Sequence, residues 1–209
     1  MKLKIKNIIL TIKDAWNYVF PIKKLLNKFK TINSPEQLQS FIQERSAHVT
    51  QTTLYGYLKT RIGTRYAMMF DDETFLESIN IAKWNIYVVS LADCTLFTIS
   101  YLICEKNLKE NEAEKIFFSM LENEKKNGLS EKLINDSILD FKQRVKETKW
   151  LDHYKQNPFK KSGSALYKWA PIADDLKVLD KEIVLNSIML KWNLVENEFK
   201  ELTKNLNFK

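Results

Sequence analysis

Glycine and proline are scarce in this chain, whose 209 residues contain four of each. Sheet proteins use these residues in their many tight turns, so the scarcity predicts long helices with few connections. Cysteine is scarcer still, and Cys94 and Cys104 lie in one apolar run. Ten residues along a helix span about 15 Å, which is too far for a disulfide. We therefore expect both to be small buried side chains in a reducing compartment.

Motifs that hold metals, phosphates or catalytic nucleophiles are also missing. The two histidines, His48 and His153, stand in no Glu-x-x-His motif, and there is no Cys-x-x-Cys pair or calcium-binding loop. Walker A and dinucleotide-binding glycine patterns are absent, and Ser162-Gly163-Ser164 lacks the second glycine of a nucleophile elbow. The sequence therefore indicates no catalytic residue, metal or cofactor, and it favours a protein that is not an enzyme.

Positive charge is confined to one end of the chain. The net charge is +7, and residues 1–30 contain eight lysines against a single acidic residue, Asp14. The remaining residues carry 25 basic and 25 acidic side chains. We therefore divide the chain into a basic segment, residues 1–30, and one neutral helical domain, residues 31–209.

The basic segment is amphipathic as well as basic. Its apolar residues follow helical spacing as far as Pro21, which ends or kinks the helix. Lysines beside a stripe with Trp and Phe are typical of a helix on an anionic membrane surface. The same stripe fits a helix docked on the domain, and lysines also bind nucleic acid or an acidic partner. The membrane or partner surface is predicted to comprise Lys2, Lys4, Ile5, Lys6, Ile8, Ile9, Ile12, Trp16, Phe20, Lys23 and Lys24.

Helix starts and stops can be located in the neutral domain from capping residues. The first helix changes its apolar side midway, so either it is buried on different sides at its two ends or it breaks around residues 50–53. Residues 150–179 are the least regular and are expected to include a loop at Ser162-Gly163-Ser164. Starts are expected at Ser34-Pro35 with Gln37, Asp71-Asp72-Glu73, Asn111 with Glu114, Ser130 and Asp180, and stops at Gly63, about Glu105 and Gly128.

The longest apolar run, Ile86–Cys104, has one charged residue among nineteen, Asp93. Eighteen such residues suffice to span a membrane, but a carboxylate near the middle and several Ser and Thr residues argue against insertion. We predict an all-α fold, an irregular multi-helix bundle around this long buried helix. Asp93 then has to be paired, protonated or functional, and a buried arginine partner is the common outcome.

A group of arginines and tyrosines forms the densest polar cluster. Arg61 and Arg65 are four residues apart, so on a continuous helix they share a face and can bind an anion. In the alternative interpretation, they pair with acids such as Asp71 and Asp72. The possible anion-binding residues are Arg45, Arg61, Arg65 and Tyr66.

Two segments, TLYGYLKTR at Thr53–Arg61 and WAPIAD at Trp169–Asp174, resemble an uncharacterised all-helical bacterial family. That resemblance implies a helical fold and no function. Our leading hypothesis is a non-enzymatic adaptor or assembly protein in the cytoplasm, with a protein partner and with residues 1–30 available to attach it to the inner-membrane surface. The alternatives are an enzyme or small-molecule binder using the arginines near Arg61 and Arg65, and a nucleic-acid binder using the N-terminal lysines. The sequence does not predict the oligomeric state.

Overall fold

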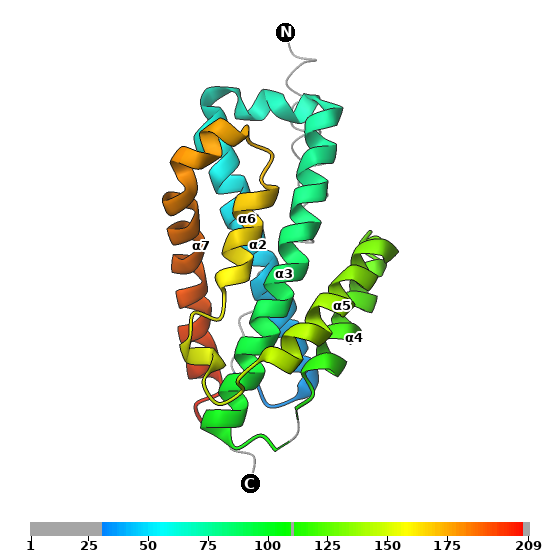
Figure 1. Ribbon diagram of the computed structural model, residues 1–209, viewed down its shortest axis with the longest axis vertical. Coiled ribbons are helices and arrows are strands. Elements are labelled where there is room, and N and C mark those ends of the chain that lie inside the picture. Colours follow the sequence, from blue (N-terminus) through cyan, green and yellow to red (C-terminus); the bar gives the residue numbers. More distant parts are fainter. Residues whose placement is uncertain (1–30, 110, 207–209) are drawn as a thin grey trace.

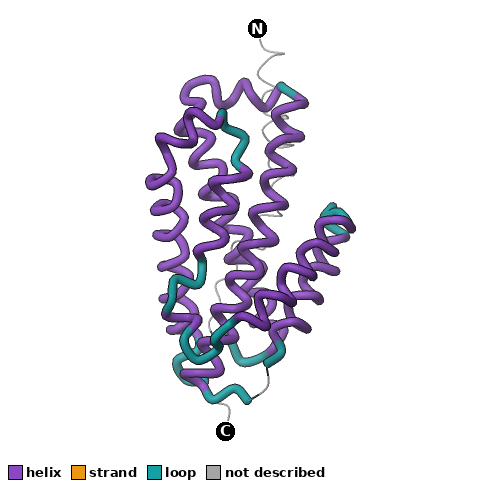
Figure 2. Tube along the Cα trace, viewed as in Figure 1, coloured by secondary structure: helices purple, strands orange, loops and turns teal. Residues whose placement is uncertain are grey.

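The computed structural model describes residues 31–109 and 111–206, so the predicted surface on residues 1–30 lies outside the described residues. Within these ranges every regular element is a helix, which confirms the predicted all-α, multi-helix fold (Figure 2). The α-helices are α2 (Pro35–Ile62), α3 (Glu73–Lys106), α4 (Ala113–Lys125), α5 (Glu131–Glu147), α6 (Lys160–Trp169) and α7 (Asp174–Leu202), and the 3-10 helices are η2 (Gly63–Asp71) and η3 (His153–Lys155).

Four of the helices form the main bundle, with α3 at its centre (Figure 1). Along the chain α2, α3, α6 and α7 run in alternating directions, and α6 packs against both α3 and α7. The short helices α4 and α5 form a hairpin that packs on the C-terminal half of α3. Helix α7 lies at the outer edge of the bundle, so one of its sides faces away from every other helix.

Helix α3 is the core helix that the sequence predicts. By length and hydropathy it could cross a membrane, but 89% of its most apolar 18-residue window is buried inside the fold. Among the residues around it are Phe97, Phe159 and Phe199, whose rings meet at centroid distances of 5.2–5.8 Å. The apolar run thus serves as the centre of a protein core, and its aromatic contacts join α3 to α7.

Helix ends follow the predicted capping residues at several places. The Oγ of Ser34 accepts a hydrogen bond from the Gln37 backbone N–H at 3.3 Å, and Ser130 does the same for Leu133 at 3.3 Å. Asp72 caps α3 through the Phe75 N–H at 3.1 Å. Each cap satisfies a backbone donor that the helix itself cannot use.

The structure decides one boundary that the sequence left open, in α2, and corrects two others. Helix α2 is continuous through residues 50–53, so its apolar side changes because its two ends are buried on different sides. At Asn111, the side chain accepts from the Ala113 N–H at 3.1 Å, and α4 has no capping box with Glu114. Helix α7 begins at Asp174, so Asp180 lies within it and does not start it.

The segment 150–179 is more regular than predicted, because Ser162-Gly163-Ser164 lies inside α6 and not in a loop. A Cβ atom on Gly163 would lie 3.2 Å from Leu185 Cδ2 and 3.5 Å from Ile188 Cγ2, both on α7. The glycine therefore marks the place where α6 and α7 approach each other closely.

Candidate functional site

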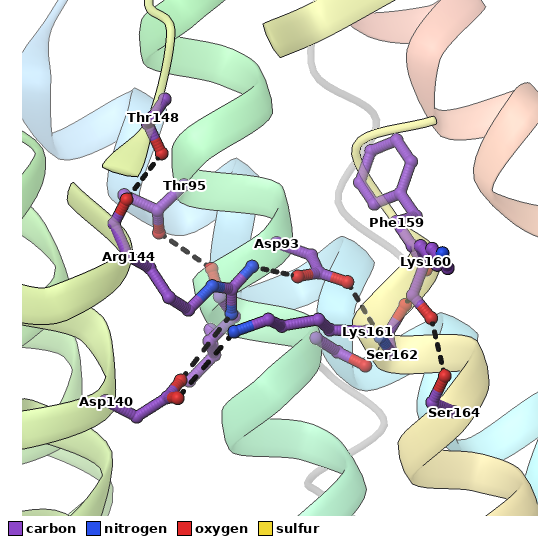
Figure 3. Close-up of polar contacts among 12 residues, drawn as sticks. Asp93, Thr95, Asp140, Arg144, Thr148, Phe159, Lys160, Lys161, Ser162 and Ser164 are labelled. Carbon is purple, nitrogen blue, oxygen red and sulfur yellow. Dashed lines mark hydrogen bonds and ion pairs between the residues drawn. The ribbon is translucent and has the colours of Figure 1, made fainter. Parts of the chain in front are cut away.

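The buried carboxylate of Asp93 lies at the centre of a polar network that joins four helices. Arg144 of α5 donates from Nη2 to Asp93 Oδ1, and the Ser162 backbone N–H of α6 donates to Oδ2 at 2.7 Å (Figure 3). The Oγ of Ser162 in turn accepts from Trp192 Nε1 of α7 at 2.9 Å. A carboxylate in an apolar helix thus has the arginine partner that its burial requires.

The electrostatics of this network are dominated by burial. Asp93 has no exposed surface and Arg144 is 6% exposed. Burial raises the pKa of Asp93, while Arg144 and the Ser162 N–H favour the charged form and offset part of that effect. The other guanidinium nitrogen, Nη1, lies 4.0 Å from Asp140 Oδ2 near the surface, and Lys161 Nζ lies 3.7 Å from Asp140 Oδ1 (Figure 3). This arrangement links α3 to α5 and α6 and leaves Asp93 enclosed by its partners.

Two of the arginines proposed for anion binding have carboxylate partners on α7. Arg61 donates from both Nε and Nη2 to Asp180, and Tyr57 donates its hydroxyl to the same carboxylate at 2.9 Å. Hydrogen bonding to Arg61 lowers the pKa of Asp180, and burial together with Asp180 raises the pKa of Tyr57 to about 12. These contacts fasten the C-terminal half of α2 to α7.

Arg45 makes a similar link between four and five turns nearer the start of α2. Its Nε and Nη2 each donate to one carboxylate oxygen of Glu198 at 2.6 Å, a bidentate pair. Sixteen residues separate Arg45 from Arg61 on one helix, or about 24 Å, so these two arginines bind different carboxylates far apart. Arg65 is exposed on η2, where Tyr66 makes an edge contact with Phe70 at 5.1 Å. Anion binding at these residues stays a prediction.

Sequence reasoning missed a second buried carboxylate, Glu124 of α4. It accepts from Gln43 Nε2 at 2.9 Å, from the Tyr87 hydroxyl at 2.9 Å and from Asn127 Nδ2 at 2.7 Å. Burial lowers the pKa of the neighbouring Lys83 to about 8, and Glu124 opposes part of that shift. The available signal was the spacing, since Glu124 continues the apolar side of α4 that holds Met120 and so lies on its buried face.

One cavity, of about 420 Å³, lies beside the first turns of α3. Its wall is mostly apolar, with the carboxylates of Glu73 and Glu77 and the amide of Asn80 at exposed positions and Lys83 at a buried one. Neither Arg61 nor Arg65 lines it. No group of three potential metal ligands occurs within residues 31–109 and 111–206.

The most unusual surface feature is on α7, which carries two apolar faces. One face is buried and includes Val184, Ile188 and Trp192. The other is exposed and follows spacings of 3, 4, 7 and 4 residues, which keeps its members on one line along the helix. We call this second set the α7 stripe: Leu176, Leu179, Ile183, Leu190 and Leu194, each between 42% and 74% exposed.

The α7 stripe was not predicted, although its spacing is visible in the sequence. Val178 is 69% exposed as well, but helical geometry turns it away from the stripe. Contiguous large apolar side chains on a protein surface are a mark of interaction sites, whereas single ones are ordinary. The stripe is therefore the strongest candidate for a functional surface among the described residues.

Comparison with known proteins gives no information on the function of the polar network, the cavity or the α7 stripe. The chain matches no protein-family model, no curated protein and no solved structure.

Proposed function

We propose that this protein is a non-enzymatic helical adaptor or assembly protein that binds a protein partner through the α7 stripe. The proposal depends on one observation, the line of five large apolar side chains on the exposed side of α7. Water contact with such a line is unfavourable, and a partner that covers it gains the corresponding burial energy.

The internal polar groups support a structural role for the bundle. Asp93, Asp180 and Glu198 each bind an arginine, and each of these ion pairs joins different helices. A catalytic site needs polar groups that converge on a space open to substrate. Two of the pairs instead join α2 to α7 and the third joins α3 to α5, so they support the packing of the helices.

Site-specific photocrosslinking in cells tests the protein-binding proposal. A benzophenone amino acid would replace Leu190 in one variant and Val178 in another, because both positions are exposed on the same helix and only Leu190 belongs to the stripe. We expect a discrete crosslinked species from position 190 alone, and its loss when Leu179→Glu is added. Equal crosslinking from both positions, or none from position 190, would remove the proposal.

Attachment to a membrane through residues 1–30 is the second part of the proposed function, and it is supported by the charge and spacing of that segment. The test is co-sedimentation of the full chain with vesicles that contain anionic phospholipid. Replacing Lys2, Lys4 and Lys6 by Gln should weaken binding by roughly a hundredfold at low salt, because each lysine near an anionic surface contributes about 1 kcal/mol and the three together about 3 kcal/mol. Binding that is unchanged by these substitutions and by salt would exclude this mode, and a complex released by nuclease would indicate nucleic acid instead.

Small-molecule binding is a second candidate function, favoured by the cavity beside α3. Its volume is within the range of ligand pockets, and its mostly apolar wall suits a small apolar molecule, while Glu73 and Glu77 beside Lys83 leave no net positive charge for an acidic group. A thermal-shift screen of small apolar compounds, repeated on Ile79→Trp to fill the cavity, would test it. A shift that survives the filled cavity would place the ligand elsewhere.

A further inference from the structure

Positive charge is concentrated in the segment 142–168, which runs from α5 into α6. This segment carries eight basic side chains against two acidic ones, Glu147 and Asp152, although residues 31–209 as a whole are neutral. All seven of its lysines are exposed. Concentrated charge of one sign attracts ions of the other sign, so this part of the surface favours anions.

The start of α6 adds to this positive field. Its first turn contains Lys160 and Lys161 and no acidic residue. The N-terminal end of a helix is the positive end of its dipole, so lysines are unfavourable there and an anion is favourable. Asp93 brings one negative charge to this end from inside the protein, but Arg144 pairs with it. The two lysines therefore need a negative partner from the solvent side.

Arg144 has one guanidinium nitrogen that is left unpaired. Its side chain is 6% exposed, and Nη2 donates to Asp93. Nη1 is buried as well, yet it makes no hydrogen bond to any residue that the structure describes. A buried donor without an acceptor costs free energy, so a group that accepts from Nη1 would be stabilised there.

Asp140 faces this nitrogen but is too far away to accept from it. Its Oδ2 lies 4.0 Å from Arg144 Nη1 and its Oδ1 lies 3.7 Å from Lys161 Nζ, whereas a charge-assisted hydrogen bond is about 2.7–2.9 Å long. Figure 3 shows both cationic groups directed at this one carboxylate. The carboxylate is tied to the backbone of α5, while its side chain is 57% exposed and has room to turn into the solvent. An anion that is not tied to a helix can approach both nitrogens more closely.

We propose that Arg144, Lys161 and the start of α6 form a binding site for a phosphate group, and that Asp140 is the negative group that the phosphate displaces. A phosphate has three strong acceptor oxygens, so it can accept from Nη1 and Nζ at the same time. When Asp140 has turned away, Arg144, Lys160 and Lys161 against Asp93 leave two positive charges, which the nearly two negative charges of a phosphate balance. The site is separate from the α7 stripe, so its test is independent of the adaptor proposal.

Isothermal titration of the full chain with inorganic phosphate, at constant ionic strength, tests this site. A range of about 0.1–30 mM covers the millimolar affinity expected for a small ion that is held by few groups. Lys161→Gln should weaken binding at least about tenfold, because it removes one charge-assisted hydrogen bond. Asp140→Ala should strengthen binding about three- to fivefold, because the anion no longer has to displace a weakly paired carboxylate.

Each variant has a control with the same change of charge at another exposed position of α5. Lys146→Gln and Asp136→Ala should each change the affinity by less than about twofold, because salt screens charges that do not touch the anion. Circular dichroism of all four variants checks that the fold is retained.

Vesicles distinguish a free phosphate from the phosphate of a lipid head group. The full chain is sedimented with vesicles that contain phosphatidic acid, whose head group is a phosphate monoester. Saturable titration with inorganic phosphate, with the stated effects of the two site variants, would identify the free ion as a ligand. Vesicle binding that Lys161→Gln weakens, Lys146→Gln preserves and Asp140→Ala strengthens, without binding of the free ion, would identify the head group. No binding in either arm, an equal loss for the two lysine variants, or an Asp140→Ala variant that binds no better would overturn the inference.

Discussion

Replacing Arg144 by Met should sharply destabilise this protein at neutral pH and far less at mildly acidic pH. The substitution keeps an unbranched, flexible apolar side chain and removes the guanidinium that faces Asp93. The carboxylate, which has no exposed surface, would then retain its contacts with Ser162, whose backbone N–H donates to it at 2.7 Å. Breaking a buried pair by removing one partner typically costs about 3–5 kcal/mol.

Protonation of Asp93 sets a ceiling on that cost. Taking up a proton at pH 7 by a group with an ordinary pKa of about 3.9 costs roughly 4 kcal/mol, at 1.36 kcal/mol per pH unit. At pH 5 the same ceiling is about 1.5 kcal/mol. In the variant the pKa of Asp93 in the folded state lies above that in the unfolded state, so the stability lost is greatest at high pH and shrinks as the pH falls towards the unfolded value.

Urea unfolding followed by circular dichroism, at pH 7 and pH 5, measures both numbers. Asp93→Asn supplies the contrast, because it leaves the Arg144 guanidinium unpaired and arginine cannot lose its proton, so its cost should be similar at both pH values. The double variant Asp93→Asn with Arg144→Met should lose only about 1–3 kcal/mol, since no charge remains buried. Lys132→Met, at an exposed position on the same helix, should stay within about 0.5 kcal/mol of the parent protein. A loss below about 1 kcal/mol for Arg144→Met at pH 7, or one that is the same at pH 5, would refute this reasoning.

Three further changes address the neighbourhood of this network. Ser162→Ala removes the acceptor of the buried Trp192 indole N–H, so the free energy of unfolding in urea should fall by about 1–3 kcal/mol; an unchanged midpoint would mean that the indole finds another acceptor. Gly163→Val should lower the free energy of unfolding by about 1–3 kcal/mol, because a Cβ there already lies 3.2 Å from Leu185. Gly163→Ala should change it by no more than about 1 kcal/mol, because alanine favours the helix. Equal thermal midpoints for the two variants would contradict the close approach of α6 and α7. Burial lowers the pKa of His153, so the folded state resists its protonation. The free energy of unfolding should therefore decline as the pH falls below about 6.5, the pKa in the unfolded state. His153→Gln should flatten that part of the curve of stability against pH, and an identical curve would disprove this assignment.

Helix ends were predictable because capping is local. Ser34, Asp72 and Ser130 each bind a backbone N–H three residues ahead, so the signal lies within one turn of sequence. The burial of α3 was also predictable from local sequence. Its long run is apolar on all sides of the helix, which indicates a core helix or a membrane span, and Asp93 argues against the membrane.

Features that depend on distant partners were not predictable in the same way. Gly163 was interpreted as part of a loop, but it lies in a helix that needs a small residue where α7 passes. Asp180 was interpreted as a helix start, but its partner, Arg61, is 119 residues away in the sequence. The two apolar faces of α7 are both visible in its spacing, yet only the packing of α2 and α6 decides which of them is covered.

The chain from Arg144 through Asp93 and Ser162 to Trp192 has an implication for synthesis on the ribosome. Its three links join residues 51, 69 and 30 positions apart, and the last of them requires the final helix. Helices α2 to α5 are synthesised first, so Asp93 and Arg144 are both present before the ribosome has added Ser162 and Trp192. A nascent chain that stalls before Trp192 would therefore expose an incomplete core to chaperones and proteases. Synthesis of α7 is the step that completes the core.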